Sequence, residues 1–416
     1  MTSKDLRARE ALIKPKGSQD LSKTCMSLAR KFFPDIVKLR RTLHKFPELA
    51  YSELETADRM YREMRKLSIV ARKGIGRTGV VGRLSGSGRS GLVALRADMD
   101  ALPVNEESGV PFASRNPGKM HACGHDTHMA MLVGAARILS HLRDELKGSV
   151  VFLFQPSEEK NPGGAPAMIK DGALEGADVV FGQHITNDVQ VGKFAFRSGP
   201  MMASADEIYI TVFGKGGHGA KPHHAIDPVY ISAQVIVALQ AVISRMRDPF
   251  DPSVLTVGSV HGGTATNIIP DSVALSGTLR TMSESWRRRA LTLITKTAKD
   301  TAASFGGRCS VEISPGYPVL SNSPDETEFA TEAARKLFGA PAVLKAPPVM
   351  GAEDFAYFLR KTPGTFWWIG GANGKIGATS SIHSATFRID ESALAYGSAF
   401  LAFLTIEYLR RREYNR

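Results

Sequence analysis

The 416-residue sequence has few cysteines: Cys25, Cys123 and Cys309 are the full set. Three widely spaced cysteines are too few for a disulfide framework of the kind found in secreted domains. We therefore expect the chain to work in a reducing compartment and predict a cytoplasmic location. Each thiol is then available for another role, such as holding a metal ion.

The sequence also lacks long apolar runs. Its first ten residues, Met-Thr-Ser-Lys-Asp-Leu-Arg-Ala-Arg-Glu, contain no apolar stretch such as a secretory signal requires, and no later run is expected to be long enough to span a bilayer. We therefore predict no membrane partner. Residues 1–30 are mostly polar and contain Pro15 and Gly17, so they are predicted to form a flexible N-terminal tail.

Charge of one sign dominates, with a formal net charge of +12, but the basic residues do not gather into a binding motif. Short clusters occur only at 287–289 and 410–412, and no aromatic residues are interleaved with them. The pattern favours solvated helix faces over a nucleic-acid surface. We predict no nucleic-acid partner and some attraction for small anionic substrates.

Four apolar runs that resemble strands are each followed by polar residues. These are Leu92–Ala97 before Asp98 and Asp100, Val150–Phe154 before Glu158 and Glu159, Val179–Gly182 before His184, and Phe366–Ile369 before His383. In open α/β sheets, ligands bind at the edge where the strands have their carboxyl ends. The pattern therefore predicts one shared site and not scattered polar residues.

A second polar cluster, His121-Ala122-Cys123-Gly124-His125-Asp126, precedes the predicted helix Met129–Leu142. The positive end of a helix favours a thiolate, which makes Cys123 a candidate ligand. Cysteine, histidine and carboxylate ligands, with one carboxylate left for proton transfer, are what a centre that activates water at neutral pH requires. The polar residues after the four strand-like runs and this second cluster together indicate a metal-dependent hydrolase.

A chain of this length is expected to form two domains. Between Ser198 and Pro315 the order of predicted elements is β-α-β-β-α-β, which is typical of a ferredoxin-like unit. These elements are Glu207–Phe213, Pro228–Met246, Val254–Val260, Ser272–Arg280, Glu284–Ser304 and Cys309–Ile313. We predict an α/β fold: a three-layer catalytic domain (31–197 and 316–416) with a mixed, mostly parallel sheet, and an inserted α+β lid and dimerisation domain (198–315).

Five segments resemble motifs of the M20 metallopeptidase family: Arg96–Pro103, Met120–Asp126, Phe154–Glu159, Gly214–Ala220 and Gly351–Phe355. Within that family the chain is similar to the amidohydrolases, which include hippurate hydrolases, N-acyl-amino-acid deacylases and plant auxin-conjugate hydrolases. The resemblance runs in order from about Arg40 to Ala402. It implies hydrolysis of N-acyl (acetyl, benzoyl or related) amino acids. The alternatives are an M20-type dipeptidase, aminopeptidase or carboxypeptidase, or a metal-binding scaffold protein, against which the presence of Glu158 argues.

The resemblance also implies a set of site residues. The metal ligands would be Cys123, His125, Glu159, His184 and His383, and Glu158 would be the general base. Cys123 would lie between two divalent ions per subunit, with zinc, manganese, cobalt or nickel all compatible with these donors. Asp98 is not expected to be a ligand, whereas Asp100 would orient an imidazole from behind.

On the inserted domain, the resemblance makes His218 a donor to the oxyanion, offered across a homodimer interface to the partner's site. The alternative is that His218 only shapes a glycine-rich turn. Asn267, Arg280 and Gly351 are candidate substrate-binding residues. His121, His128 and His141 are predicted to be structural. His223 and His224 are either residues of a site on the lid domain or exposed loop residues, and the sequence does not decide between the two. Ser157 and Ala385 stand where alanine and proline are usual, so the acyl preference stays open.

Overall fold

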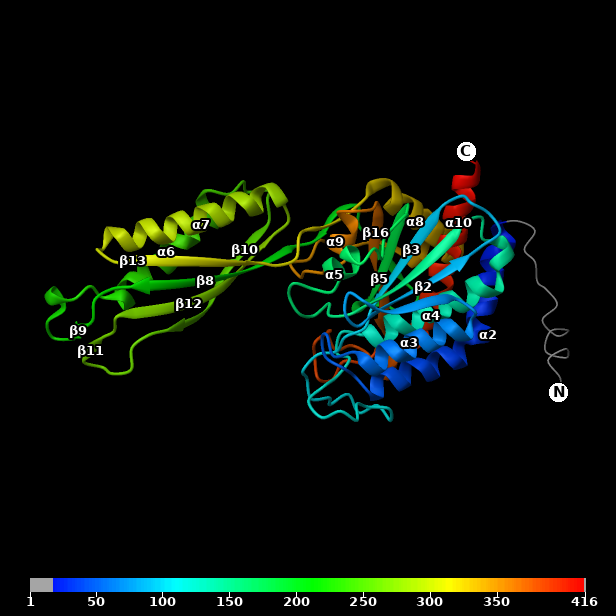
Figure 1. The fold of residues 1–416 in the computed structure, drawn as a ribbon, viewed down its shortest axis with the longest axis horizontal. Coiled ribbons are helices and arrows are strands. Elements are labelled where there is room, and N and C mark those ends of the chain that lie inside the picture. The colour runs from blue at the N-terminus through cyan, green and yellow to red at the C-terminus, as the bar shows by residue number, and fades with distance from the viewer. Residues whose placement is uncertain (1–17, 415–416) are drawn as a thin grey trace. The chain divides into compact units, whose positions relative to one another are not determined.

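The computed structural model describes residues 18–414, which divide into two compact units (Figure 1). The first unit contains 18–198, 322–346 and 358–414, and the second contains 199–321 and 347–357. The second unit therefore takes up a segment, 347–357, that the sequence placed in the catalytic domain. Its attachment is direct, because the backbone N–H of Ala203 donates to the carbonyl oxygens of Val349 and Gly351.

The first unit is built on an eight-stranded sheet with the order β1-β2-β4-β3-β5-β16-β6-β15. Its strands are β1 (Val70–Ile75), β2 (Gly79–Ser85), β3 (Leu92–Asp98), β4 (Ser149–Gln155), β5 (Val179–Gln190), β6 (Phe194–Phe196), β15 (Val343–Lys345) and β16 (Gly364–Ala372). The four central strands β4, β3, β5 and β16 run parallel, and β1, β2 and the β6–β16 pair are antiparallel. The predicted mixed, mostly parallel α/β sheet is confirmed.

Continuous apolar runs make the central strands because such strands are buried on both faces. Every residue of β3 is buried, as is all of β4 after its first residue. The helices of this unit are α2 (Ser18–Lys45), α3 (Leu54–Lys66), α4 (His125–His141), α5 (Ala165–Lys170), α8 (Pro324–Phe338) and α10 (Ala393–Tyr414), with 3-10 turns η1 (Arg143–Glu145), η3 (Ala340–Ala342) and η4 (Gly374–Ile376). Helix α9 (Ala356–Leu359) is divided between the units. Helices α2, α4 and α10 pack against one another, and α4 also contacts β3 and β5.

The predicted N-terminal tail is wrong for residues 18–30, which belong to α2. Leu21, Cys25 and Ala29 are fully buried in the main core of the first unit. Their spacing of four residues places them on one face of the helix. Polar residues between them hide this stripe in the composition of the segment. Residues 1–17 lie outside the described residues.

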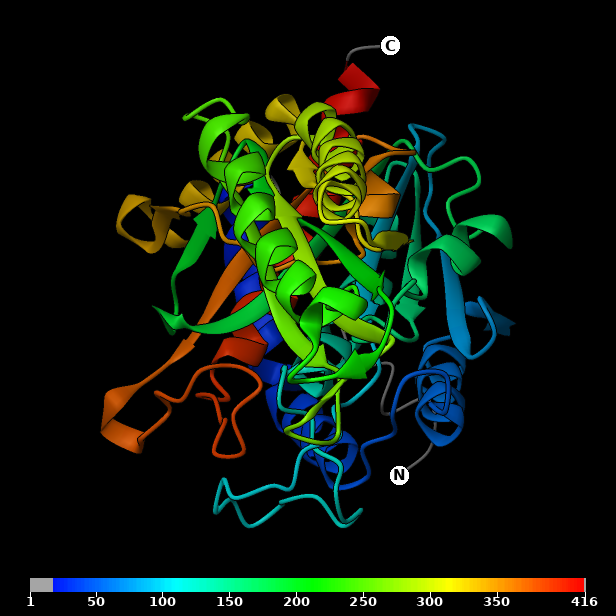
Figure 2. The ribbon, with the colours of Figure 1, turned by 90° about the vertical axis from the view of Figure 1, so that its left-hand side faces the viewer.

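The second unit has the predicted ferredoxin-like order. It consists of β8 (Ser204–Phe213), α6 (Pro228–Arg245), β10 (Ser253–His261), β12 (Ser272–Thr281), α7 (Glu284–Ser304) and β13 (Arg308–Pro315), with the short strands β7 (Gly199–Met202), β9 (Gly217–His218), β11 (Ile268–Ile269) and β14 (Leu320–Asn322) and the 3-10 turn η2 (Pro222–His224). The four long strands form an antiparallel sheet, β10-β12-β8-β13. Figure 2 shows α6 and α7 side by side along this sheet, and their apolar residues fill its core.

Helix α6 has a strongly apolar composition. In the described part of the chain, 18–414, it is the one helix long and apolar enough by composition to cross a membrane. The expectation that no run reaches this length is therefore wrong. A core helix passes the same test, and Ile231, Val235 and Leu239 of α6 are buried among the apolar residues of the second unit.

Candidate metal centre

The five side chains that the resemblance implies as ligands lie together at the carboxyl edge of the parallel strands. They form two overlapping groups that share one thiol: Cys123 with His125 and His184, and Cys123 with Glu159 and His383. The Sγ atom of Cys123 is 3.3 Å from Nε2 of His184 and 3.3 Å from Nε2 of His383. Oε1 of Glu159 is 3.4 Å from Nε2 of His383 and 3.7 Å from Nε2 of His125.

These distances fit donors that share a cation. Two ligands of one tetrahedral zinc ion, with bonds of about 2.0–2.3 Å, lie about 3.3–3.6 Å apart. Neither ring nitrogen of His125 makes a hydrogen bond within the described residues, although the side chain is fully buried. A buried imidazole without partners costs stability unless another ligand satisfies it. The donor set therefore fits divalent metal ions, with Cys123 available to both groups of donors.

Hydrogen bonds fix which nitrogen His184 presents to the centre. Its Nδ1 lies 2.7 Å from the carbonyl oxygen of Ile185, which can only accept, so Nδ1 carries the proton. The lone pair of Nε2 then faces Cys123. Burial is the main cause that holds the pKa of His184 well below its usual range, so the ring stays neutral. A neutral imidazole with a free Nε2 is the form that binds metal.

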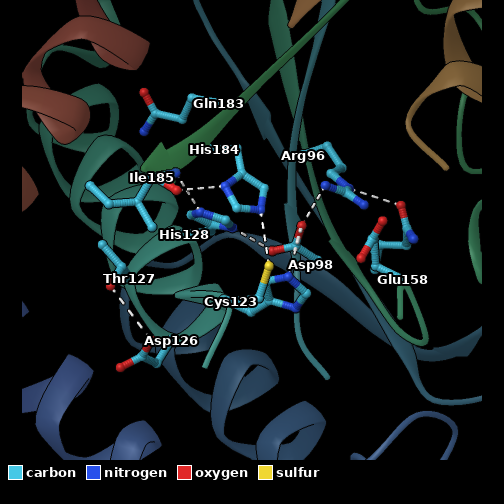
Figure 3. A network of polar contacts seen from close by, with 12 residues as sticks. Arg96, Asp98, Cys123, Asp126, Thr127, His128, Glu158, Gln183, His184 and Ile185 are labelled. Atoms are coloured by element: carbon cyan, nitrogen blue, oxygen red, sulfur yellow. Dashed lines mark hydrogen bonds and ion pairs between the residues drawn. The ribbon is translucent and has the colours of Figure 1, made fainter. Parts of the chain in front are cut away.

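His128 supports this arrangement from behind (Figure 3). Its Nε2 accepts the backbone N–H of Ile185 at 2.8 Å, so its proton must lie on Nδ1, which is 2.6 Å from Oδ1 of Asp98. Ile185 therefore contacts both histidines through its two backbone polar groups. From the sequence alone, His128 is predicted to have only a structural role on a helix. The sequence did contain a signal for this role. His128 lies on α4 three residues after the proposed ligand His125, so it faces the same sheet.

The carboxylate of Asp98 is committed to its neighbours. Oδ2 accepts from Nη1 of Arg96 at 2.6 Å, and Oδ1 accepts from His128. Burial opposes ionisation of Asp98, but Arg96 and the two nearby imidazoles outweigh it and lower the pKa of Asp98 well below its usual range. Asp98 lies 3.8 Å from Nε2 of His125. Arg96 is a charged residue within an otherwise apolar buried strand, which is the pattern by which it could have been found.

Asp100 lies beneath both glutamates of the site. Its Oδ1 and Oδ2 accept the backbone N–H groups of Glu158 and Glu159, each at 2.9 Å. Oδ1 is also 3.5 Å from Nδ1 of His125. The contacts to the glutamate backbones were not foreseen. Orientation of an imidazole by Asp100 stays a prediction at this longer distance.

Burial and nearby carboxylates set the electrostatics of the centre. Burial, followed by Glu159, Glu158 and Asp98, raises the pKa of the Cys123 thiol well above its usual range. Burial disfavours the charged form of His125, but the surrounding carboxylates, Asp98 first, outweigh it and raise its pKa to about 10. That the start of the helix favours a thiolate at Cys123 stays a prediction, because the surrounding carboxylates act in the opposite direction. A divalent cation held by these donors would favour the thiolate.

His383 reaches the site from a loop and not from a strand. It follows η4, has a left-handed backbone with φ of 65°, and its N–H donates to the carbonyl oxygen of Ala122 at 2.8 Å. This backbone contact brings the loop to the residue that precedes Cys123. Its side chain is about half exposed, which leaves this side of the centre open.

Four predicted residues lie in the second unit. The backbones of His218 and Asn267 are close, because His218 pairs with Ile268 and the N–H of Gly219 donates to the carbonyl oxygen of Asn267. Arg280 lies on β12 eight residues beyond Ser272, which at about 3.3 Å per residue is roughly 26 Å along the strand. The structure therefore does not bring Arg280 beside Asn267 within one chain. Gly351 accepts the N–H of Ala203.

The other histidines differ in their surroundings. His121 is buried, its pKa is lowered to about 3 by burial, and its ring nitrogens have no hydrogen-bond partner among the described residues. His141 is exposed at the end of α4. His223 and His224 are exposed with ring centroids 4.1 Å apart, so the structure leaves their role open.

Comparison with known proteins identifies the family. The model of peptidase family M20/M25/M40 matches residues 94–407. The chain belongs to this family. It is 41% identical to thermostable carboxypeptidase 1 of Saccharolobus solfataricus over 90% of the chain and 95% of that protein. It is 38% identical to N-acetyl-L-cysteine deacetylase of Bacillus subtilis over 88% of the chain and 86% of that protein.

A solved structure supports the metal centre. The Bacillus subtilis YXEP protein, described as a dinuclear metal-binding peptidase of family M20, is 34% identical and superposes with a TM-score of 0.81 over 92% of this chain and 99% of that one. Family membership and the converging donors make this chain a metal-dependent hydrolase of amide bonds.

Proposed function

We propose that this M20 hydrolase cleaves N-acyl amino acids to a carboxylic acid and a free amino acid. The observation that carries the proposal is the cluster of Cys123, the histidines and Glu159, with Glu158 beside it, in a chain similar to an N-acetyl-L-cysteine deacetylase. Cys123, His125 and His184 would hold one divalent ion, and Cys123, Glu159 and His383 the other. The identity of the ions is open between zinc, manganese, cobalt and nickel.

Glu158 is the proposed general base and acid. The residue is 6% exposed, and one of its carboxylate oxygens lies within 4.8 Å of a ring nitrogen of His125 and a carboxylate oxygen of Glu159. When bound, the divalent ions polarise the amide carbonyl and acidify the attacking water. Glu158 accepts the proton of that water and returns it to the leaving nitrogen. Asp100 fixes the backbone N–H of Glu158 and so limits the directions in which its carboxylate points.

His218 is the proposed donor to the oxyanion. Its Nδ1 accepts the backbone N–H of Ala220 at 3.0 Å, so the proton of the neutral ring lies on Nε2. The residue is exposed on the second unit, with Nε2–H available to a substrate. Donation from a partner subunit is the proposed arrangement, with a homodimer formed through the second units.

A subunit-mixing experiment tests the homodimer and the trans role together. Inactive Glu158→Gln and inactive His218→Ala proteins would be co-expressed. If His218 acts in trans, one site of each mixed dimer pairs an intact Glu158 with an intact partner histidine, and about half of the wild-type activity per dimer returns by site counting. If each histidine serves its own chain, no activity returns and the trans arrangement fails.

The substrate carboxylate is proposed to bind to Asn267, Arg280 and the loop at Gly351. Amide and guanidinium donors suit that anion. Because Arg280 is distant from Asn267 along the second unit, one chain would supply Asn267 and the partner chain Arg280 in the proposed dimer. Replacing either residue is expected to raise KM for the same substrate. If only one of the two replacements raises KM, the other residue does not bind the substrate carboxylate.

Carboxypeptidase activity is the second candidate, because the chain is 41% identical to a protein named thermostable carboxypeptidase. Both reactions break an amide next to a free carboxylate, so they differ only in the size of the acyl side. The deciding assay is amine release from N-acetyl and N-benzoyl amino acids, set against dipeptides and N-blocked dipeptides, after addition of zinc, manganese or cobalt. Preference for the peptides would replace the first candidate. The three free cysteines are consistent with the reducing, cytoplasmic setting we propose.

A further inference from the structure

The geometry points to Glu53 as a positioning residue that sets the direction of Glu158 and the place of Glu159 without touching either side chain. This inference rests on the proposed role of Glu158. No motif in the sequence singles out Glu53, which lies between α2 and α3 and immediately precedes α3. Its carboxylate is fully buried, although glutamate is rarely found so unless it is paired.

The contacts of Glu53 lead to the loop that carries both glutamates. Oε1 accepts the backbone N–H of Ser157 at 2.8 Å and that of Tyr51 at 2.9 Å, and Oε2 accepts the hydroxyl of Thr78 at 2.7 Å. Each carboxylate oxygen therefore has a partner, and none of the partners is a cation. The side chain acts as an acceptor for three donors from three different loops.

Glu53 and Asp100 together bind three successive backbone N–H groups. Glu53 accepts from Ser157, and the two oxygens of Asp100 accept from Glu158 and Glu159. Ser157 has a φ of 53°, in the left-handed region that is unfavourable for a residue with a side chain. Such a conformation persists where surrounding contacts determine it. The two carboxylates supply those contacts at the residue just before the proposed base.

The loop that contains residues 157–163 is also fixed at its C-terminal end. The hydroxyl of Tyr51, two residues before Glu53, donates to the carbonyl oxygen of Gly163 at 2.8 Å. The loop closes tightly, because a Cβ atom on Gly164 would lie 1.9 Å from the carbonyl oxygen of Pro156. The segment from Tyr51 to Glu53 therefore holds residues 157–163 at both ends. Loss of the Glu53 contact would free the end that carries the catalytic glutamates.

The test compares Glu53→Ala, which removes the acceptors, with Glu53→Gln, which keeps one carbonyl oxygen for the Ser157 and Tyr51 donors. Glu55→Ala, an exposed glutamate two residues further along the chain, is the matched control. In Glu53→Ala we expect about tenfold faster hydrogen exchange at Ser157 and Glu158, the effect of losing one hydrogen bond. We expect kcat to fall about 10- to 100-fold because the base is misplaced, with KM little changed. Glu53→Gln should stay close to the wild type in both measurements.

A second variant and the hydrogen-exchange readout cover the cases in which Glu53→Ala does not fold or the wild-type enzyme shows no activity. If Glu53→Ala does not fold, Glu53→Asp replaces it, because it keeps the charge but shortens the side chain by one methylene and should show the same exchange and kcat changes. If the wild-type enzyme hydrolyses no N-acyl amino acid, the proposed function fails, while hydrogen exchange in 157–160 still decides the role of Glu53. A folded Glu53→Ala protein with wild-type exchange and wild-type kcat would overturn the inference. So would a Glu53→Gln protein as impaired as Glu53→Ala.

Discussion

The two units differ most in how they use buried charge. In the ferredoxin-like part of the second unit, 204–315, the buried charged residues are Asp206 and Arg287, which pair with each other. The first unit buries a larger set of charged and histidine side chains: Arg40, His44, Glu53, Glu63, Arg96, Asp98, Asp100, His121, His125, Asp126, His128, Glu158 and His184. An isolated buried charge is costly, so such a set persists only where each member has partners or a bound cation. The first unit therefore buries a network of ionisable side chains that includes the candidate metal ligands, whereas residues 204–315 bury one ion pair within an apolar core. The remaining segment of the second unit, 347–357, adds the buried Glu353 and Asp354.

The largest effect on the metal centre of the first unit is expected from removal of the shared thiol. Cys123→Ala takes away the one ligand common to both metal groups, so we expect loss of bound metal and of activity. Metal content per chain, measured by elemental analysis, is the readout. Cys309→Ala, a free thiol in the second unit, should keep the full metal content. Full occupancy and unchanged activity in Cys123→Ala would show that the ligand set is wrong.

Glu158→Gln is expected to separate chemistry from metal binding. The amide cannot accept the proton of the attacking water, so kcat should fall about 10²- to 10⁴-fold while metal content stays nearly complete. Steady-state kinetics with an N-acyl amino acid and elemental analysis measure the two effects. Glu175→Gln, an exposed glutamate of the same unit, is the control. Turnover near that of the wild type would reject Glu158 as the base.

In the second unit, the largest stability effect is expected at its buried ion pair. Arg287 donates to both oxygens of Asp206, at 2.8 and 2.7 Å. Arg287→Met leaves Asp206 buried without its cation, which should cost about 3–5 kcal/mol of unfolding free energy. Denaturant unfolding measures this, with exposed Arg288→Met as the control. The double variant Arg287→Met with Asp206→Leu should recover most of the loss, and no recovery would mean that the pair is not its source.

The smallest of these effects is expected behind the metal ligands. His128→Phe removes the acceptor for the N–H of Ile185, whose carbonyl orients His184. Metal affinity, measured by competition with a chelator, should fall about 10- to 100-fold, as is typical when a partner of a ligand is lost. His141→Phe, at the exposed end of the same helix, should leave it unchanged. Equal affinities in all three proteins would show that Ile185 holds His184 without help from His128.

Much of the fold follows from local patterns. Apolar runs in β3, β4, β5 and β16 identify buried parallel strands, and the order of elements identifies the ferredoxin-like unit. The tail was mispredicted because the buried stripe at Leu21, Cys25 and Ala29 is narrow and polar residues surround it. A helical period is visible in sequence only where the apolar face is wide enough to dominate the local composition.

For the site, the residue types and their spacing indicate the chemistry: two adjacent carboxylates and His184 follow predicted strands whose carboxyl ends share an edge, and Cys123 and His125 stand at the start of a helix. How these side chains are held depends on the folded chain. His383 meets Cys123 across 260 positions of sequence, and Glu53 meets Ser157 across 104. The tautomers of His184 and His128 follow from one backbone unit, Ile185, placed between them. The physical reason is that residue type and period act locally, whereas a buried hydrogen bond depends on which distant donor the folded chain brings within reach.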